Sequence, residues 1–188
     1  MKVIISILAA ILLVSCSHLN TYKPVDDVKT LDVKFGFYKW NGIKIPKEGI
    51  SIKCGGDGIS PDFYVSNIPK GANAILLEYE DSYLKRLGYP MSNGAYWIST
   101  DGKTEVYVPS VVEGTRELPE GIYVEREHSG SKVFNEATGV YRAPNSCYFT
   151  NKGAGHRYFV HVKAVYKPYD EEDQGLLLGY AFLELGTF

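Results

Sequence analysis

Cysteine is scarce in this sequence, with 3 among 188 residues, too few for a disulfide scaffold or a zinc ribbon. An excess of either charge is also missing, because 20 Lys and Arg residues are balanced by 22 Asp and Glu residues. A net charge of −2 provides no basic surface for nucleic acid. A phosphate loop, a Gly-x-Ser-x-Gly elbow and a His-Glu-x-x-His pair are absent too. We therefore expect no cofactor and no nucleic-acid partner.

Long amphipathic helices are not expected either, because no stretch of about 12 residues beyond the first 16 has a 3.6-residue apolar period. The composition instead includes 15 Tyr, 19 Gly and 9 Pro residues. Tyrosine favours strands, and glycine and proline mark turns. The length suits one domain. We predict a single, mainly β domain.

The first 15 residues have the features of a signal peptide. A basic start, Met1-Lys2, precedes an apolar run from Val3 to Val14 that is too short to cross a bilayer. Leu13-Val14-Ser15-Cys16 resembles the bacterial lipoprotein box, so residues 1–15 are interpreted as a lipoprotein signal peptide and Cys16 as the lipidated residue, carrying for example palmitate. An ordinary secretory signal or an N-terminal anchor helix is the alternative.

Residues 16–34 are polar and without periodicity, so we predict that they form a tether between the lipid and the domain. Lipidation would make a membrane the first partner of the protein and place it in the bacterial cell envelope. Because Ser17 rather than Asp follows Cys16, resemblance to enterobacterial sorting favours the outer membrane, facing the periplasm.

Strand signals begin at about Phe35. Asn41-Gly42 between two short apolar segments predicts a hairpin. Alternation predicts a strand over Asn73–Asp81, with Ile75, Leu77, Tyr79 and Asp81 on one face, and another over Arg157–Tyr166. Further strands are expected over Ala95–Thr100, Glu105–Val108 and Leu176–Phe188.

Two polar residues stand at the ends of apolar strand faces. Asp81 follows Tyr79 on the same face, and His156 precedes Tyr158 on its own face. A polar side chain at the end of an apolar strand face lies where the core opens to solvent, at the mouth of a pocket. Most polar residues at strand ends, however, have only a structural role. Cys54 and Cys147 could pair in an oxidising periplasm, but the sequence does not show whether they approach each other.

Six segments in order resemble the phosphatidylethanolamine-binding protein family, which includes the Raf kinase inhibitor proteins and their bacterial homologues. The resemblance spans about Ile43 to Phe188. The segments are Gly58-Ile-Ser60-Pro61, Ile68-Pro69-Lys-Gly71, the strand ending at Asp81, Gly94-Ala-Tyr96-Trp97, Asn135…Gly139-Val-Tyr141-Arg-Ala143-Pro144 and Gly153-Ala-Gly-His156-Arg157-Tyr158.

The resemblance implies an antiparallel β-sandwich with few short helices over residues 35–188. It also implies a non-enzymatic pocket for a small anionic or phospho-head-group ligand, because imidazole and phenol groups can donate to anionic oxygens. Carried over by position, the ligand-binding residues are Asp81, Tyr96, Pro144, His156 and Tyr158. Tyr96 stands where the family has a histidine, and Ser82-Tyr83-Leu84 replaces the family's residues after Asp81. These departures predict weaker anion binding.

Two other functions remain open from the sequence. A hydrolase would use His156 as its base with Ser60 or Cys147 as nucleophile, although neither stands in a nucleophile motif. A protein-interaction or protease-inhibitor-like scaffold would contact its partner through Tyr148-Phe149 or Arg86–Tyr89. A metal site is not expected, since His161 has the opposite strand parity to Tyr158 and should point away from Asp81 and His156.

Overall fold

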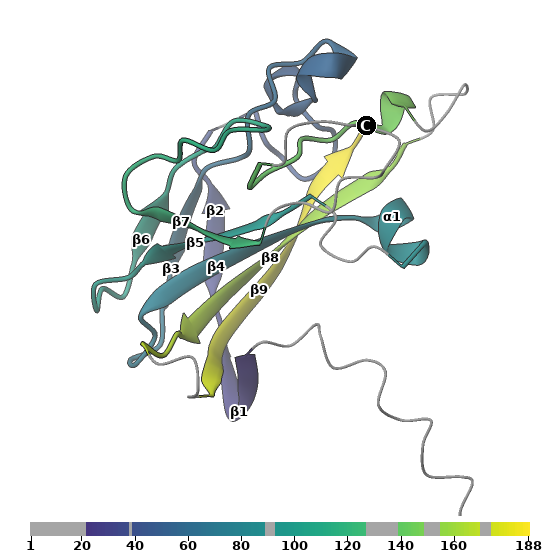
Figure 1. Cartoon of the computed structure of the whole chain (residues 1–188). Helices are drawn as coiled ribbons and strands as arrows, with labels where there is room; N and C mark the ends of the chain where they lie inside the picture. Colours follow the sequence, from purple (N-terminus) through teal and green to yellow (C-terminus); the bar gives the residue numbers. More distant parts are fainter. Residues whose placement is uncertain (1–21, 38, 89–92, 127–138, 149–154, 170–173) are drawn as a thin grey trace, which may run out of the picture.

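The fold consists of two β-sheets packed face to face, as the computed structural model shows (Figure 1). The structure describes residues 22–37, 39–88, 93–126, 139–148, 155–169 and 174–188. The six-stranded sheet has the order β1-β9-β8-β4-β5-β7, and the three-stranded sheet has the order β2-β3-β6. The strands are β1 (Tyr22–Thr30), β2 (Asp32–Phe35), β3 (Phe63–Ser66), β4 (Ala74–Asp81), β5 (Ala95–Ser99), β6 (Val106–Val108), β7 (Ile122–Arg126), β8 (Arg157–Tyr166) and β9 (Gly175–Thr187).

Helical structure in the described residues is limited to four short elements. They are α1 (Ser82–Arg86), η1 (Lys47–Gly49), η2 (Ile52–Cys54) and η3 (Ser146–Tyr148). No helix within the described ranges combines the length and apolar character needed to span a membrane. The expectation of a mainly β fold with few short helices is confirmed.

The main core lies between the two sheets. From the large sheet it takes Ile75 and Leu77 of β4 and Val160 and Val162 of β8, which face residues of β3 and β6 such as Phe63 and Val108. The alternation in β4 and β8 therefore predicted the buried face correctly. All eight residues of β4 are buried. On its second face, Ala74 and Leu76 pack in a smaller cluster with Tyr22 and Val165, and Glu78 and Glu80 pair with lysines.

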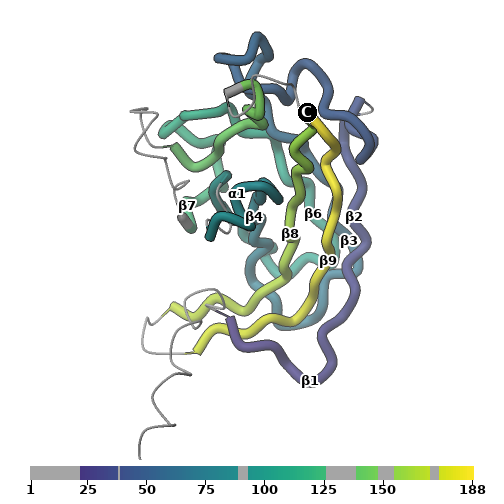
Figure 2. The backbone as a smooth tube through the Cα atoms, turned by 90° about the vertical axis from the view of Figure 1, so that its right-hand side faces the viewer, coloured from purple at the N-terminus to yellow at the C-terminus, as the bar shows by residue number. Residues whose placement is uncertain are grey.

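The prediction of a polar tether over residues 16–34 is wrong from Tyr22 onward. β1 runs parallel to β9, and β2 pairs antiparallel with β3, so the chain passes from one sheet to the other near Leu31 (Figure 2). β1 is an edge strand whose side chains are mostly exposed or half-buried, and such a strand needs no apolar alternation. The domain thus includes residues 22–34, whereas residues 1–21, with Cys16, lie outside the described residues.

The predicted hairpin at Asn41-Gly42 is also wrong. The Asn41 side-chain oxygen accepts hydrogen bonds from the backbone amides of Ile43 and Lys44, at 2.9 and 3.3 Å. Ile43 and Ile45 then bond to Thr187 at the end of β9. The Asn-Gly signal therefore marks a local turn that leads the chain to β9, while β2 takes β3 as its partner.

A disulfide joins Cys54 of η2 to Cys147 of η3. Their Cα atoms are 6.0 Å apart, within the range that a disulfide can bridge. The bond crosses 93 residues of sequence and fixes the segment around Ser146. The structure thus answers the question that the sequence left open about these two cysteines.

Candidate functional site

The antiparallel pairing of β4 with β8 brings Asp81 and His156 together. β4 ends at Asp81, which is in register with Tyr158 near the start of β8. His156 immediately precedes β8, and its Nδ1 lies 2.8 Å from Asp81 Oδ2. Both side chains are buried, with relative exposures of 4% for His156 and 0% for Asp81. An ionised carboxylate can only accept, so His156 Nδ1 carries the proton in this contact.

Asp81 also begins the short helix α1, which continues directly from β4 (Figure 1). Its Oδ1 accepts hydrogen bonds from the backbone amides of Tyr83 and Leu84, at 2.8 and 3.3 Å. This is an N-cap, in which a carboxylate satisfies amides that the helix leaves unpaired. The Tyr83 ring stacks on the His156 ring, with centroids 4.6 Å apart. The departure from the family pattern after Asp81 therefore forms a helical turn that covers His156.

Tyr158 completes this cluster. Its side chain is 1% exposed, and its hydroxyl accepts a hydrogen bond from the Asn145 amide at 3.1 Å. Burial, followed by the negative charge of Asp81, raises the pKa of Tyr158. The phenol thus stays neutral at physiological pH and keeps a proton to donate.

Pro144 lies in a buried segment, residues 142–146, that borders the same cluster. Its carbonyl accepts a hydrogen bond from the Ser51 amide at 2.9 Å, which links this segment to the loop at η2. The next residues make the contacts to the site. Asn145 contacts Tyr158, and the Ser146 hydroxyl donates to the carbonyl of Phe188 at 2.5 Å. Phe188 in turn exchanges backbone hydrogen bonds with His156.

Tyr96 belongs to a cluster of hydroxyl groups with Tyr79 and Ser60. Its hydroxyl lies 2.8 Å from that of Tyr79 and 3.4 Å from Ser60 Oγ. In the β4–β5 register Tyr96 faces Leu77, and four strand residues, or about 13 Å, separate Leu77 from Asp81. Burial raises the pKa of Tyr96 to about 12. Of the five predicted ligand-binding residues, direct contacts join Asp81, His156 and Tyr158, whereas the hydroxyl contacts of Tyr96 are with Tyr79 and Ser60.

The sequence interpretation missed Arg142, which is only 4% exposed. Its backbone amide donates to the carbonyl of Asn93 at 3.0 Å, and the Asn93 side chain donates to its carbonyl at 2.8 Å. With the Asn145 amide turned so that its oxygen faces the guanidinium, that oxygen accepts from Arg142 Nε and Nη2 at 2.7 and 2.5 Å. The sequence contained one hint of this residue. Arg142 is a charged residue inside the Gly139…Pro144 motif, at a position where the family pattern specifies no residue.

The nucleophiles considered for a hydrolase are engaged elsewhere. Cys147 is in the disulfide. Ser60 Oγ accepts from the Val111 amide at 2.9 Å and contacts the Pro61 carbonyl at 3.2 Å. These contacts do not involve His156.

The opposite strand parity of His161 is confirmed. His161 contacts Glu80 at 3.2 Å and the Tyr180 hydroxyl at 2.8 Å, rather than Asp81. Burial opposes ionisation of Glu80, but hydrogen bonds from His161 and Lys85 outweigh it and lower the pKa of Glu80. Among the described residues, no three His, Cys, Asp or Glu side chains are grouped to hold a metal ion.

The loop residues suggested for a protein partner are described only in part. Tyr89 and Phe149 lie outside the described residues. Arg86 is exposed, and its guanidinium lies 5.7 Å from the centre of the Tyr83 ring.

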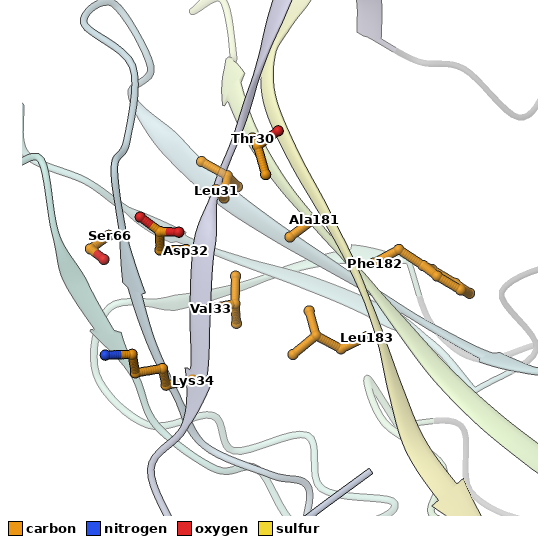
Figure 3. A pocket seen from close by; sticks show the side chains of 9 residues that line it. All are labelled: Thr30, Leu31, Asp32, Val33, Lys34, Ser66, Ala181, Phe182 and Leu183. Atoms are coloured by element: carbon orange, nitrogen blue, oxygen red, sulfur yellow. The ribbon is translucent and has the colours of Figure 1, made fainter.

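A groove of about 540 Å³ lies between β2 and β9 (Figure 3), and none of the predicted site residues lines it.

No protein-family model matches the sequence, and no curated protein matches it either. Among solved structures, the chain is similar to CT736 of Chlamydia trachomatis, described as a phosphatidylethanolamine-binding protein homologue, with 19% identity, a TM-score of 0.45 and coverage of 85% of this chain and 97% of the other. It is also similar to YbcL of Escherichia coli, described as a new member of the mammalian PEBP family, with 14% identity, a TM-score of 0.49 and coverage of 84% and 97%. Both neighbours carry the name of the family that the sequence motifs resemble.

Proposed function

We propose that the chain is a lipid-anchored, non-enzymatic envelope protein of the phosphatidylethanolamine-binding family. Its site binds a small anionic or phospho-head-group ligand beside Asp81 and His156. The observation that carries this proposal is the buried 2.8 Å contact between these two side chains, next to the neutral phenol of Tyr158.

The chemistry of the proposed site depends on the orientation of the imidazole. Asp81 engages Nδ1 of His156, so Nε2 is on the far side of the ring and is the atom that we expect to meet a ligand oxygen. A protonated His156 donates from Nε2, and charge-assisted bonds of this type are the stronger ones. The Tyr83 ring stacks on one face of the imidazole, so we expect a ligand to approach the edge of the ring rather than that face.

The absence of catalysis is part of the proposal. A hydrolytic role for His156 needs a nucleophile within hydrogen-bond reach. The engagement of Cys147 in a disulfide and of Ser60 with the Val111 amide supports a binding role instead.

Isothermal titration of the purified protein with inorganic phosphate and with phosphoethanolamine tests this function. We expect saturable binding at millimolar or lower ligand, weakened at least about tenfold in His156→Gln. His161→Gln is the matched control, because His161 contacts Glu80 and Tyr180 on the opposite face and should leave binding unchanged. Equal binding in all three proteins, or none in the wild type, would overturn the proposal.

The membrane partner is proposed through Cys16. An acyl chain contributes roughly 0.8 kcal/mol per buried CH₂, so several chains on one cysteine hold a protein on a bilayer stably. This arrangement leaves the domain from Tyr22 onward in the periplasm, where the Cys54–Cys147 disulfide is compatible with an oxidising environment.

A further inference from the structure

The groove between β2 and β9 lies where two paired stretches of backbone separate. β1 and β9 form a ladder as far as the pair Thr30–Tyr180, and the Leu31 amide then donates to the Tyr180 carbonyl at 3.1 Å. Beyond this bond the chain enters β2, which pairs with β3 of the other sheet, while β9 continues to Thr187 beside β8. The groove opens at this point of separation (Figure 3).

The last hydrogen bond of the ladder sets the direction of the backbone groups that follow it. In a strand, the N–H and C=O groups of every second residue point to the same side. Leu31 donates toward β9, so the N–H and C=O of Val33 point away from β3 and into the groove. The Gly36 amide, which has the opposite parity, donates toward β3, as this direction requires. Tyr180 accepts on the β1 side, so the N–H and C=O of Phe182 face the groove from β9.

Two strand edges with unpaired backbone groups therefore face each other across the groove. Within the ranges that the structure describes, no backbone hydrogen bond is made on the groove side at Val33 or Phe182. An open strand edge is a template for pairing with another chain. An extended polypeptide is the occupant that supplies donors and acceptors to both edges at the spacing of a strand.

The side chains that line the groove indicate what this extended chain carries. Val33, Ala181 and Leu183 are half-buried and pack against the main core, so they form an apolar floor between the strands (Figure 3). Asp32 and Lys34 alternate with Val33 and are exposed. A strand whose apolar residues face the floor and whose charged residues lie beside Asp32 and Lys34 matches this pattern.

The size of the groove suits a short segment. A strand residue occupies about 160 Å³, from a rise of about 3.3 Å, a strand spacing of about 4.8 Å and a layer thickness of about 10 Å. A groove of about 540 Å³ therefore holds about three residues of an extended chain.

We propose that this groove binds a short extended segment of a partner protein, which inserts as an additional strand between β2 and β9. The segment alternates apolar with charged residues and continues the ladder that β1 leaves at Tyr180. This interaction surface is separate from the proposed anion site, because Asp81, His156 and Tyr158 do not line the groove.

Amide hydrogen exchange, followed by NMR, tests this surface with a panel of synthetic peptides. Each peptide has about eight residues, is capped at both ends, and alternates valine with lysine, aspartate or threonine in all arrangements. We expect at least one peptide to bind at millimolar or lower concentration and to slow exchange of the Val33 and Phe182 amides at least about tenfold. N-methylation of every second residue of that peptide removes donors to one edge and should abolish binding. Tyr107 lies in β6, the opposite edge of the small sheet, and is the internal control whose exchange should not change.

A proline substitution tests the backbone contact from the side of the protein. Val33→Pro removes the N–H that points into the groove, at an edge position where proline is tolerated, and should weaken peptide binding at least about tenfold. Tyr107→Pro is the matched control on the opposite edge and should bind as the wild type does. Circular dichroism checks the fold of both variants. If Val33→Pro does not fold, the N-methylated peptides decide, because equal binding of methylated and unmethylated forms contradicts strand pairing.

Three results would overturn the proposal. The first is the absence of protection at Val33 and Phe182 with every peptide at millimolar concentration. The second is equal protection at Tyr107, which would show unspecific adhesion to sheet edges. The third is protection of Val33 and Phe182 without peptide in a protein that sediments as a dimer, which would identify a second copy of the chain as the occupant.

Discussion

Asp81 uses both of its carboxylate oxygens, and one of them meets His156. Oδ2 lies 2.8 Å from His156 Nδ1, while Oδ1 accepts from the backbone amides of Tyr83 and Leu84. One side chain therefore ties together the end of β4, the start of α1 and the residue before β8. The same contacts that we assign to ligand binding also support the fold.

Replacement of Asp81 should therefore affect stability strongly. Asp81→Ala removes the helix cap and leaves His156 without its buried partner, so the free energy of unfolding should fall by roughly 3 kcal/mol or more. Asp81→Asn keeps acceptor and donor atoms and should lose less. Urea denaturation measures both. Asp57→Ala, at an exposed loop position, is the control. A loss below about 1 kcal/mol in Asp81→Ala would contradict this account.

The hydroxyl of Tyr141 is buried and has no hydrogen-bond partner among the described residues. Tyr141→Phe removes this unpaired group, so the free energy of unfolding should stay the same or rise by about 1 kcal/mol. Tyr96→Phe is the matched comparison, because it deletes contacts to Tyr79 and Ser60 and should destabilise by about 1 kcal/mol. Equal losses in the two variants would show that the Tyr141 hydroxyl is paired in solution.

Alkaline pH should destabilise the protein through its buried phenols. Burial raises the pKa of Tyr96 to about 12 and raises those of Tyr79, Tyr141 and Tyr158 as well. The unfolded chain loses these protons near pH 10. The contribution of the buried phenols to the free energy of unfolding is therefore fully present below that pH and is lost as the pH rises above it. Each phenol contributes at most about 1.4 kcal/mol per pH unit.

Two measurements check this pH dependence together. Urea denaturation at pH 8, 10 and 11 gives the free energy of unfolding, and absorbance at 295 nm counts ionised phenols in the folded protein. We expect the four buried tyrosines to ionise only when the protein unfolds. Ionisation of all 15 tyrosines near pH 10 while the protein remains folded would be incompatible with their burial.

Lipid attachment is predicted at Cys16. When the full chain is expressed in a bacterium that processes lipoproteins and is labelled with palmitate, we expect label in the protein and recovery in the membrane fraction. Cys16→Ser should lose both, while Cys54→Ser, which changes a disulfide cysteine, should keep the label. Labelling that persists in Cys16→Ser would place the lipid elsewhere or exclude this anchor.

The sequence predicted the parts of the fold that depend on apolar alternation. β8 alternates because one of its faces lies in the main core, and the predicted strand over Arg157–Tyr166 coincides with it; β4 was found by the same apolar pattern, although both of its faces are buried. β1 escaped prediction because an edge strand held by backbone bonds to β9 needs no apolar pattern. The Asn41-Gly42 turn was misread because pairing partners depend on the whole sheet rather than on the turn.

For the site, the sequence predicted residues at strand ends better than residues in loops. Asp81 and His156 meet because β4 and β8 are antiparallel neighbours, whereas the sequence grouped them only through the family resemblance. Tyr96 was assigned to the site by motif position alone, and the β4–β5 register places it beside Leu77. Arg142 was missed because the family pattern specifies no residue at its position, and its contacts to Asn93 come from a segment far away in the sequence.

The most direct test of the central claim observes His156 itself. We would follow the imidazole resonances of His156 by NMR while inorganic phosphate and phosphoethanolamine are titrated into the purified protein, with His161 as the internal control. The account predicts a saturable shift of the His156 resonances at millimolar or lower ligand and none for His161. His156 resonances that do not move at millimolar ligand, or that move only as much as those of His161, would contradict it.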